Sequence, residues 1–161
     1  MMNITYTLTQ NEYQEAVYYH YKSGKRPLII SVFLGLATFM ILVGTDFSNT
    51  REVITNILTV FFSISFYLLF VRMLTSYQSK KVYEKSPILS DEVSLHISKK
   101  GIQYNKNIGT QLLPWGNFTK WKQNENAYLL YTNHYQFNVI PKRVMTQEQR
   151  KELENYLERY L

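Results

Sequence analysis

The chain has no cysteine among its 161 residues. Disulfide bonds, thiolate zinc sites, iron–sulfur clusters and cysteine nucleophiles are therefore excluded, and cysteine usage says nothing about the redox compartment. The sequence also lacks the Walker A, GxSxG, GxGxxG and HExxH motifs of nucleotide-binding loops, hydrolases, dinucleotide sites and zinc proteases. From these absences we predict a protein that is not an enzyme and that holds no cofactor.

Charged residues are missing from two long apolar runs, residues 28–44 and 53–71. A membrane-spanning helix needs about 17–25 predominantly apolar residues. We therefore predict a transmembrane helical hairpin over residues 27–74. The alternative is a pair of core helices in a soluble protein, but a chain this small has little left to cover two helices that are apolar on every face. Without ionisable residues in the runs, a self-sufficient transporter is not expected.

Basic residues gather at the outer ends of the hairpin, and the net charge of the chain is +6. These residues are Lys22, Lys25 and Arg26 before the first run, and Arg72, Lys80, Lys81 and Lys85 after the second. The connecting residues 45–52 carry only Asp46, Arg51 and Glu52 as charges. Lys and Arg near spanning helices favour the cytoplasmic side. We expect both termini in the cytoplasm, with the protein in the plasma (inner) membrane.

Residues 1–26 form the first predicted segment, a strand followed by an interfacial helix. Ile4, Tyr6 and Leu8 alternate with polar residues, as in a half-buried strand. Thr9 and Glu12 have the spacing of a capping box, and the following tyrosine-rich helix should end near Gly24. Tyrosine suits a membrane interface because its ring is apolar and its hydroxyl is polar.

After residue 74 we predict a helical extension over residues 75–88, which should end at Ser86-Pro87 because the residue before proline avoids the helical region. We predict a small cytoplasmic domain over residues 89–161. About six short alternating strands follow residue 88, with turns at residues 99–101, 105–107, 124–126 and 133–134. We expect asparagine to supply positive φ in the last two turns. Thr146 and Gln149 predict a capping box at the start of a C-terminal amphipathic helix. The predicted fold class is an α+β membrane protein, with an antiparallel β domain closed by that helix.

Several segments in their order and spacing resemble the YcxB-like family of small bacterial membrane proteins. They are ITYTLTQNEYQEA, the two adjacent apolar runs, HISKKGIQ, the lone Trp115 after a strand, and IPKR before the last helix. The resemblance covers nearly the whole chain. It implies a two-helix anchor in a bacterial membrane and a pleckstrin-homology-like cytoplasmic domain, without an established biochemical activity.

Five residues are candidates for binding a partner or an anion: Lys142, Arg143, Trp115, Lys99 and Lys100. Lys142 and Arg143 precede a helix, whose free amides and dipole favour an anion; the alternative is a proline-shaped turn with solvated cations. Trp115 is either an exposed anchor for a partner or, as we favour, a side chain that packs the last helix onto the sheet. His96 and His134 lie far apart without a companion acid, so no metal site is expected.

The first functional hypothesis is a membrane-anchored adaptor whose cytoplasmic domain binds a protein partner or anionic lipid head groups. This rests on analogy between folds. The alternatives are a self-protection protein against a bacteriocin and an accessory subunit of a transporter. We expect membrane lipids and a protein as partners, and leave homo-oligomerisation open. Docking to an anionic membrane, worth about 1 kcal/mol for each nearby Lys or Arg, ranks above nucleic-acid binding.

Overall fold

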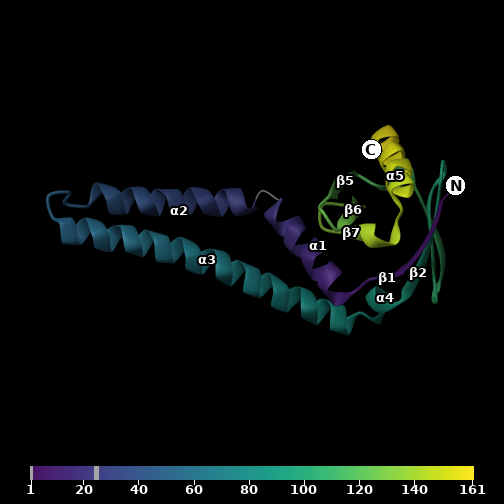
Figure 1. The fold of residues 1–161 in the computed structure, drawn as a ribbon, viewed down its shortest axis with the longest axis horizontal. Helices are drawn as coiled ribbons and strands as arrows, with labels where there is room; N and C mark the ends of the chain where they lie inside the picture. Colours follow the sequence, from purple (N-terminus) through teal and green to yellow (C-terminus); the bar gives the residue numbers. More distant parts are fainter. Residues whose placement is uncertain (1, 24–25) are drawn as a thin grey trace. The chain divides into compact units, whose positions relative to one another are not determined.

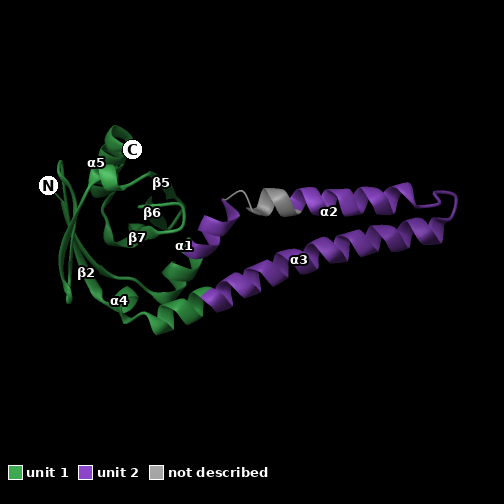
Figure 2. Ribbon diagram, turned by 180° about the vertical axis from the view of Figure 1, so that it is seen from behind, with its two compact units in different colours: residues 1–16, 79–161 green, residues 17–78 purple. Residues whose placement is uncertain are grey.

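The computed structural model describes residues 2–23 and 26–161, and the chain divides into two compact units (Figure 2). Unit 1 comprises residues 1–16 and 79–161, and unit 2 comprises residues 17–78. Unit 1 contains antiparallel sheets and a C-terminal helix, so the predicted α+β class with an antiparallel β domain is confirmed. Lys25 and the predicted helix end at Gly24 lie outside the described residues.

The first sheet of unit 1 has four antiparallel strands in the order β1-β2-β3-β4. They are β1 (Met2–Thr7), β2 (Glu92–Ser98), β3 (Gly101–Lys106) and β4 (Gly109–Pro114) (Figure 1). The predicted N-terminal strand is confirmed, because Met2, Ile4 and Tyr6 are buried while the residues between them are exposed. It pairs with β2, with Tyr6 opposite Val93. Unit 1 therefore contains more of the chain than the range 89–161 delimited from the sequence.

The second sheet contains β5 (Lys120–Gln123), β6 (Ala127–Tyr131) and β7 (Phe137–Pro141) in that order. Every residue of the central strand β6 is buried. The six predicted strands after residue 88 are present, but they fall into two sheets. The break lies between β4 and β5, where Pro114 ends β4 and the 3-10 turn η1 (Trp115–Asn117) follows.

Glycine, and not asparagine, provides the positive φ angles of the hairpins. The described residues with positive φ are Gly101, at +141°, and Gly109, at +137°. A Cβ at Gly101 would lie 2.2 Å from the carbonyl oxygen of Leu113, so this position also requires glycine for space. The turn predicted at residues 105–107 is wrong in position, since β3 continues to Lys106 and Gly109 starts the next strand. The turn forms next to Gly109 because glycine adopts positive φ at little steric cost.

The asparagine turns work through their side chains, which corrects the predicted reason for them. The Asn124 side-chain oxygen accepts hydrogen bonds from the backbone N–H groups of Asn126 (2.9 Å) and Ala127 (2.7 Å). Asn133 does the same for Tyr135 and Gln136, both at 2.8 Å. Each side chain thus replaces a backbone acceptor in the turn, as is common for asparagine.

Helices complete unit 1. The helix α5 (Gln147–Tyr160) starts with the predicted capping box of Thr146 and Gln149, and it buries Leu153 and Leu157 completely. The η2 turn (Lys142–Val144) leads into it, and α4 (Pro87–Ser90) follows the predicted break at Ser86-Pro87. The helix α1 (Gln10–Lys22) begins in unit 1. Its predicted capping box is present, since the Glu12 carboxylate accepts from the Thr9 backbone N–H at 2.9 Å.

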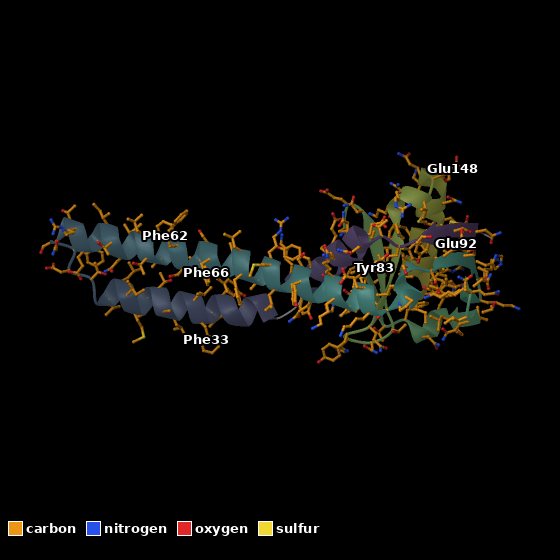
Figure 3. All side chains as sticks on the ribbon, turned by 90° about the horizontal axis from the view of Figure 1, so that it is seen from below. Phe33, Phe62, Phe66, Tyr83, Glu92 and Glu148 are labelled. Atoms are coloured by element: carbon orange, nitrogen blue, oxygen red, sulfur yellow. The ribbon has the colours of Figure 1, made fainter. Side chains whose placement is uncertain are left out.

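Unit 2 contains α2 (Arg26–Val43) and most of α3 (Thr50–Lys85). Among the described residues, α3 is the one helix long and apolar enough to cross a membrane, and the described apolar part of α2, Ser31–Val43, is shorter. Large apolar side chains are exposed along both helices. Phe33 on α2 and Phe62 on α3 project outward (Figure 3), with exposed fractions of 68% and 65%.

Polar side chains of unit 2 bond to nearby parts of the same unit. The hydroxyls of Thr38, Thr55, Thr59 and Thr75 each donate to the carbonyl four residues earlier, at 2.7–2.9 Å. The Asn56 amide donates to the Thr45 hydroxyl at 2.8 Å and so ties α3 to the loop after α2. These hydrogen bonds satisfy polar groups without water.

Candidate functional site

Trp115 lies in η1, and its indole ring is buried, with an exposed fraction of 4%. The ring stacks on Tyr156 and Tyr160 of α5, each with its centroid 5.6 Å away. Its indole N–H donates to the carbonyl of Ser98 at 3.0 Å. This is the packing role favoured from the sequence, and a ring so enclosed offers no surface to a partner.

Lys142 lies in η2 and is held by the second sheet. Its ammonium group donates to the Gln123 side-chain oxygen and the Asn124 carbonyl, both at 2.7 Å, and lies 4.7 Å from the centroid of the Tyr128 ring. Burial, together with the Arg150 charge, lowers the pKa of Lys142, against the opposing influence of Glu154. The cation is therefore used within the fold.

Arg143 joins η2 to the N-terminal segment of the chain. Its Nε donates to the Glu12 carboxylate at 2.6 Å, and its Nη2 donates to the Thr7 carbonyl at 2.9 Å. Burial raises the pKa of Glu12, but the hydrogen bonds from Arg143 and Thr9 outweigh it and the net pKa is lowered. The hydrogen bond to Glu12 in turn raises the pKa of Arg143. This pair connects residues that are 131 positions apart in the sequence.

The surroundings of Lys142 and Arg143 are balanced in charge, which argues against the predicted anion site. A depression of about 330 Å³ lies there, lined by Asn11, Glu12, Glu15, Glu125, Asn126, Lys142, Arg143 and Arg150. The first free amides of α5 are served by its own capping box, and Arg150 donates to the Lys142 carbonyl at 2.6 Å. With as many carboxylates as cations, the depression has no surplus positive charge for an anion.

Lys99 and Lys100 occupy the exposed turn between β2 and β3, away from the other basic pair. Arg143 contacts Thr7, which lies opposite Glu92 at the start of β2, whereas Lys99 follows the last residue of that strand. The 7 residues of β2 span roughly 20 Å. The structure therefore does not bring the two pairs of cations together.

A groove that no sequence pattern had indicated lies between the exposed edges of the two sheets. It has a volume of about 570 Å³ and is lined by Gln111, Leu113, Asn117, Thr132, Gln136, Phe137 and Asn138. We call it the β4–β7 groove. None of its lining residues is charged, so it carried no signal of the kind that singled out the lysines and arginines. Its one sequence signal is the absence of charge from residues 107–119.

A second feature that no sequence pattern had indicated is the environment of the Tyr104 hydroxyl. This hydroxyl is fully buried without a hydrogen-bond partner among the described residues, and burial raises its pKa. The side chain lines a cavity of about 70 Å³ that shares Phe137 and Asn138 with the β4–β7 groove. Within residues 2–23 and 26–161, no cluster of three His, Asp or Glu side chains could hold a metal ion.

Comparison with known proteins assigns the C-terminal part of the chain. Residues 97–157, from the end of β2 to α5, match the family model described as YcxB-like protein. This confirms the resemblance to the YcxB-like family, and the matched region lies wholly in unit 1. Searches of curated proteins and of solved structures gave no match.

Proposed function

We propose that this YcxB-like protein is a membrane-anchored, non-catalytic adaptor of the bacterial plasma membrane. In this proposal α2 and α3 cross the membrane as a hairpin, both termini are cytoplasmic, and unit 1 is the domain that binds a partner. Self-protection against a bacteriocin and service as a transporter subunit stay predictions, because no contact in the described residues favours either.

The pairing of β1 with β2 carries the proposal. Thr7 lies opposite Glu92 in one ladder, so the chain leaves unit 1 near residue 16 and returns to it near residue 79. The two ends of unit 2 must then lie on the same side of a membrane. If α3 crosses, the chain has to cross an even number of times, and the other helix available within unit 2 is α2.

The dimensions and surface of unit 2 support this hairpin. The 18 residues of α2 extend about 27 Å, close to the thickness of a hydrocarbon core of roughly 30 Å. Large apolar side chains of both helices are not covered by other parts of the protein. In water, exposing such an apolar surface would cost free energy. The internally bonded threonine hydroxyls suit a medium that offers no hydrogen bonds.

Charge supports the orientation. Arg51, in the first turn of α3, is the single cation among residues 44–52, and Asp46 and Glu52 accompany it. In contrast, Arg72, Lys80 and Lys81 follow the apolar part of α3. The excess of cations next to unit 1 agrees with its cytoplasmic placement.

The geometry of unit 1 favours a protein partner over lipid head groups. Lys142 and Arg143 are engaged within the fold, so the remaining candidate cations are Lys99 and Lys100, which are exposed at one turn. A pleckstrin-homology-like architecture is supported by two antiparallel sheets onto which the C-terminal helix packs through Trp115. We propose that architecture as part of the adaptor role.

Two experiments test the proposal. Extraction of cell membranes with alkaline carbonate should leave the protein in the pellet, and complete release would contradict anchoring.

In-cell crosslinking, followed by purification in native membrane discs and mass spectrometry, should recover a partner protein at comparable abundance. Recovery of lipid alone would contradict the adaptor role; a Lys99→Ala, Lys100→Ala variant with reduced binding to anionic vesicles would then support lipid docking.

A further inference from the structure

The outer edge of β4 is open. β4 is the last strand of the four-stranded sheet, and all its residues except Leu113 are exposed. Among the described residues, no backbone hydrogen bond reaches β4 beyond its ladder with β3. An open edge presents unpaired N–H and C=O groups that pair readily with another extended chain.

This edge lacks the usual protection against such pairing. Proteins generally blunt an exposed edge with charged residues, bulges or proline. Residues 107–119 contain no charge, and Pro114 stands only at the end of β4. Two apolar side chains, Ile108 and Leu112, are exposed beside the edge, with fractions of 71% and 48%. In a chain of net charge +6 this is a neutral surface.

The β4–β7 groove lies on the face of β4 that turns toward the core. Gln111 pairs with Tyr104, and Leu113 pairs with Ile102, and both partners on β3 are buried. A strand added to β4 would send every second side chain to this same face, because strand side chains alternate. Those side chains would enter the groove between β4 and the start of β7, where Phe137 and Asn138 form the opposite wall.

The lining of the groove defines what would fit. Gln111, Asn117 and Asn138 present side-chain amides with no hydrogen-bond partner among the described residues, and the groove holds no charged side chain. A buried charge without a partner is costly, whereas a hydroxyl or amide could bond to these amides. Phe137 and Asn138 also line the neighbouring cavity. There the Tyr104 hydroxyl, which has no hydrogen-bond partner among the described residues, offers a further polar group.

We propose that the edge of β4 and the β4–β7 groove bind an extended, uncharged segment of a partner protein by strand addition. The segment hydrogen-bonds through its backbone to β4 and places short hydroxyl or amide side chains at alternate positions into the groove. This inference deepens the proposed function, since it names the class of partner, and it rests on that adaptor role. It does not depend on the candidate cations.

The test uses the full chain in phospholipid nanodiscs and a labelled peptide of about nine residues with alternating serine and valine. Saturable binding should slow hydrogen exchange of the amides at residues 109–113. N-methylation of every second peptide amide removes donors from one edge and should weaken binding at least about tenfold, because several backbone hydrogen bonds are lost. Replacing the serines with lysine or with glutamate should weaken binding in both cases.

A matched pair of variants locates the site. Leu112→Lys introduces a charge on the edge strand and should abolish measurable binding, whereas Ile108→Lys, in the preceding turn, should leave it within about twofold. Unchanged exchange at residues 109–113, or equal binding of the N-methylated peptide, would overturn the proposal. Protection that appears without peptide and grows with protein concentration would assign the edge to a second copy of the chain. Retention in the discs is scored separately, so failed anchoring is distinguishable from a failed groove.

Discussion

Unit 1 and unit 2 both contain apolar segments, and they place the apolar side chains in opposite ways. In unit 1, β6 is buried throughout and Leu153 and Leu157 of α5 are inaccessible. In unit 2, phenylalanines such as Phe33 and Phe62 are turned outward. The comparison shows that unit 1 encloses its apolar side chains in a core of its own, whereas unit 2 leaves its large apolar side chains exposed. The proposed membrane hairpin would account for this difference.

The largest effect is expected at the buried aromatic cluster of unit 1. Replacing Trp115 with alanine should destabilise unit 1 by about 3–5 kcal/mol, because the stacking on Tyr156 and Tyr160 and a buried hydrogen bond are lost. Denaturant unfolding followed by circular dichroism measures the loss. Trp121→Ala, at a half-buried position, is the control and should cost clearly less. Equal losses would remove the special role of Trp115.

A lysine introduced on the exposed apolar surface should affect membrane insertion in unit 2 and have no such effect in unit 1. Phe62→Lys, near the middle of residues 53–71, should disfavour membrane insertion by about 2.5–3.5 kcal/mol. The fraction of protein resistant to carbonate extraction reports the change. Tyr135→Lys, at an exposed turn of unit 1, should have no effect on that fraction. Unchanged insertion of Phe62→Lys would mean that this surface of unit 2 does not face lipid.

Two buried tyrosines sharpen the account of the unit 1 core. The Tyr6 hydroxyl donates to the Val139 carbonyl at 2.7 Å and so links β1 to β7, whereas the Tyr104 hydroxyl has no partner among the described residues. We expect Tyr6→Phe to cost about 1–2 kcal/mol of unfolding free energy, and Tyr104→Phe to be neutral or stabilising. Thermal unfolding of both variants tests this. A larger loss of stability for Tyr104→Phe than for Tyr6→Phe would contradict the view that, of the two, only the Tyr6 hydroxyl makes a stabilising hydrogen bond.

The smallest effect concerns the Glu12–Arg143 ion pair. Since the pKa of Glu12 is lowered in the folded protein, its contribution is present above the ordinary carboxyl value near 4.5 and is lost as the pH falls below it. The Arg143 side chain is 52% exposed. Screening by solvent therefore keeps the contribution of the ion pair to the unfolding free energy below about 1 kcal/mol. Stability measured from pH 6 to 3 should fall less steeply for Glu12→Gln. An identical slope would show that the pair adds nothing.

Much of the local structure of unit 1 could be predicted, because strand alternation and capping boxes are properties of neighbouring residues. The alternation around Ile4 and Tyr6 and the Thr146–Gln149 box both appear in the structure. The turn at Gly109 was misplaced because asparagines nearby carry a similar turn signal. For Trp115 the sequence left two roles open, with packing favoured, and in the structure its ring stacks on Tyr156 and Tyr160 of α5.

Long-range relations could not be predicted in the same way. The pairing of β1 with β2 joins residues separated by the whole hairpin, and the Arg143–Glu12 pair joins residues 131 positions apart. That pair changes Arg143 from a candidate ligand-binding residue to a structural one. The β4–β7 groove depends on how two sheet edges meet, and its neutral residues carry no chemical signal in the sequence.

The most direct test of the central claim is labelling of single cysteines in intact cells, because the native chain has no cysteine and each variant then carries one labelling site. Reporters at Ser48 in the loop, Asn11 in α1 and Glu148 in α5 sample three exposed positions. For a hairpin with both termini in the cytoplasm, we expect a membrane-impermeant maleimide to label Ser48→Cys directly, and to label Asn11→Cys and Glu148→Cys only after permeabilisation. Labelling of Asn11→Cys but not Glu148→Cys, or protection of Ser48→Cys, would contradict a hairpin that crosses the membrane twice.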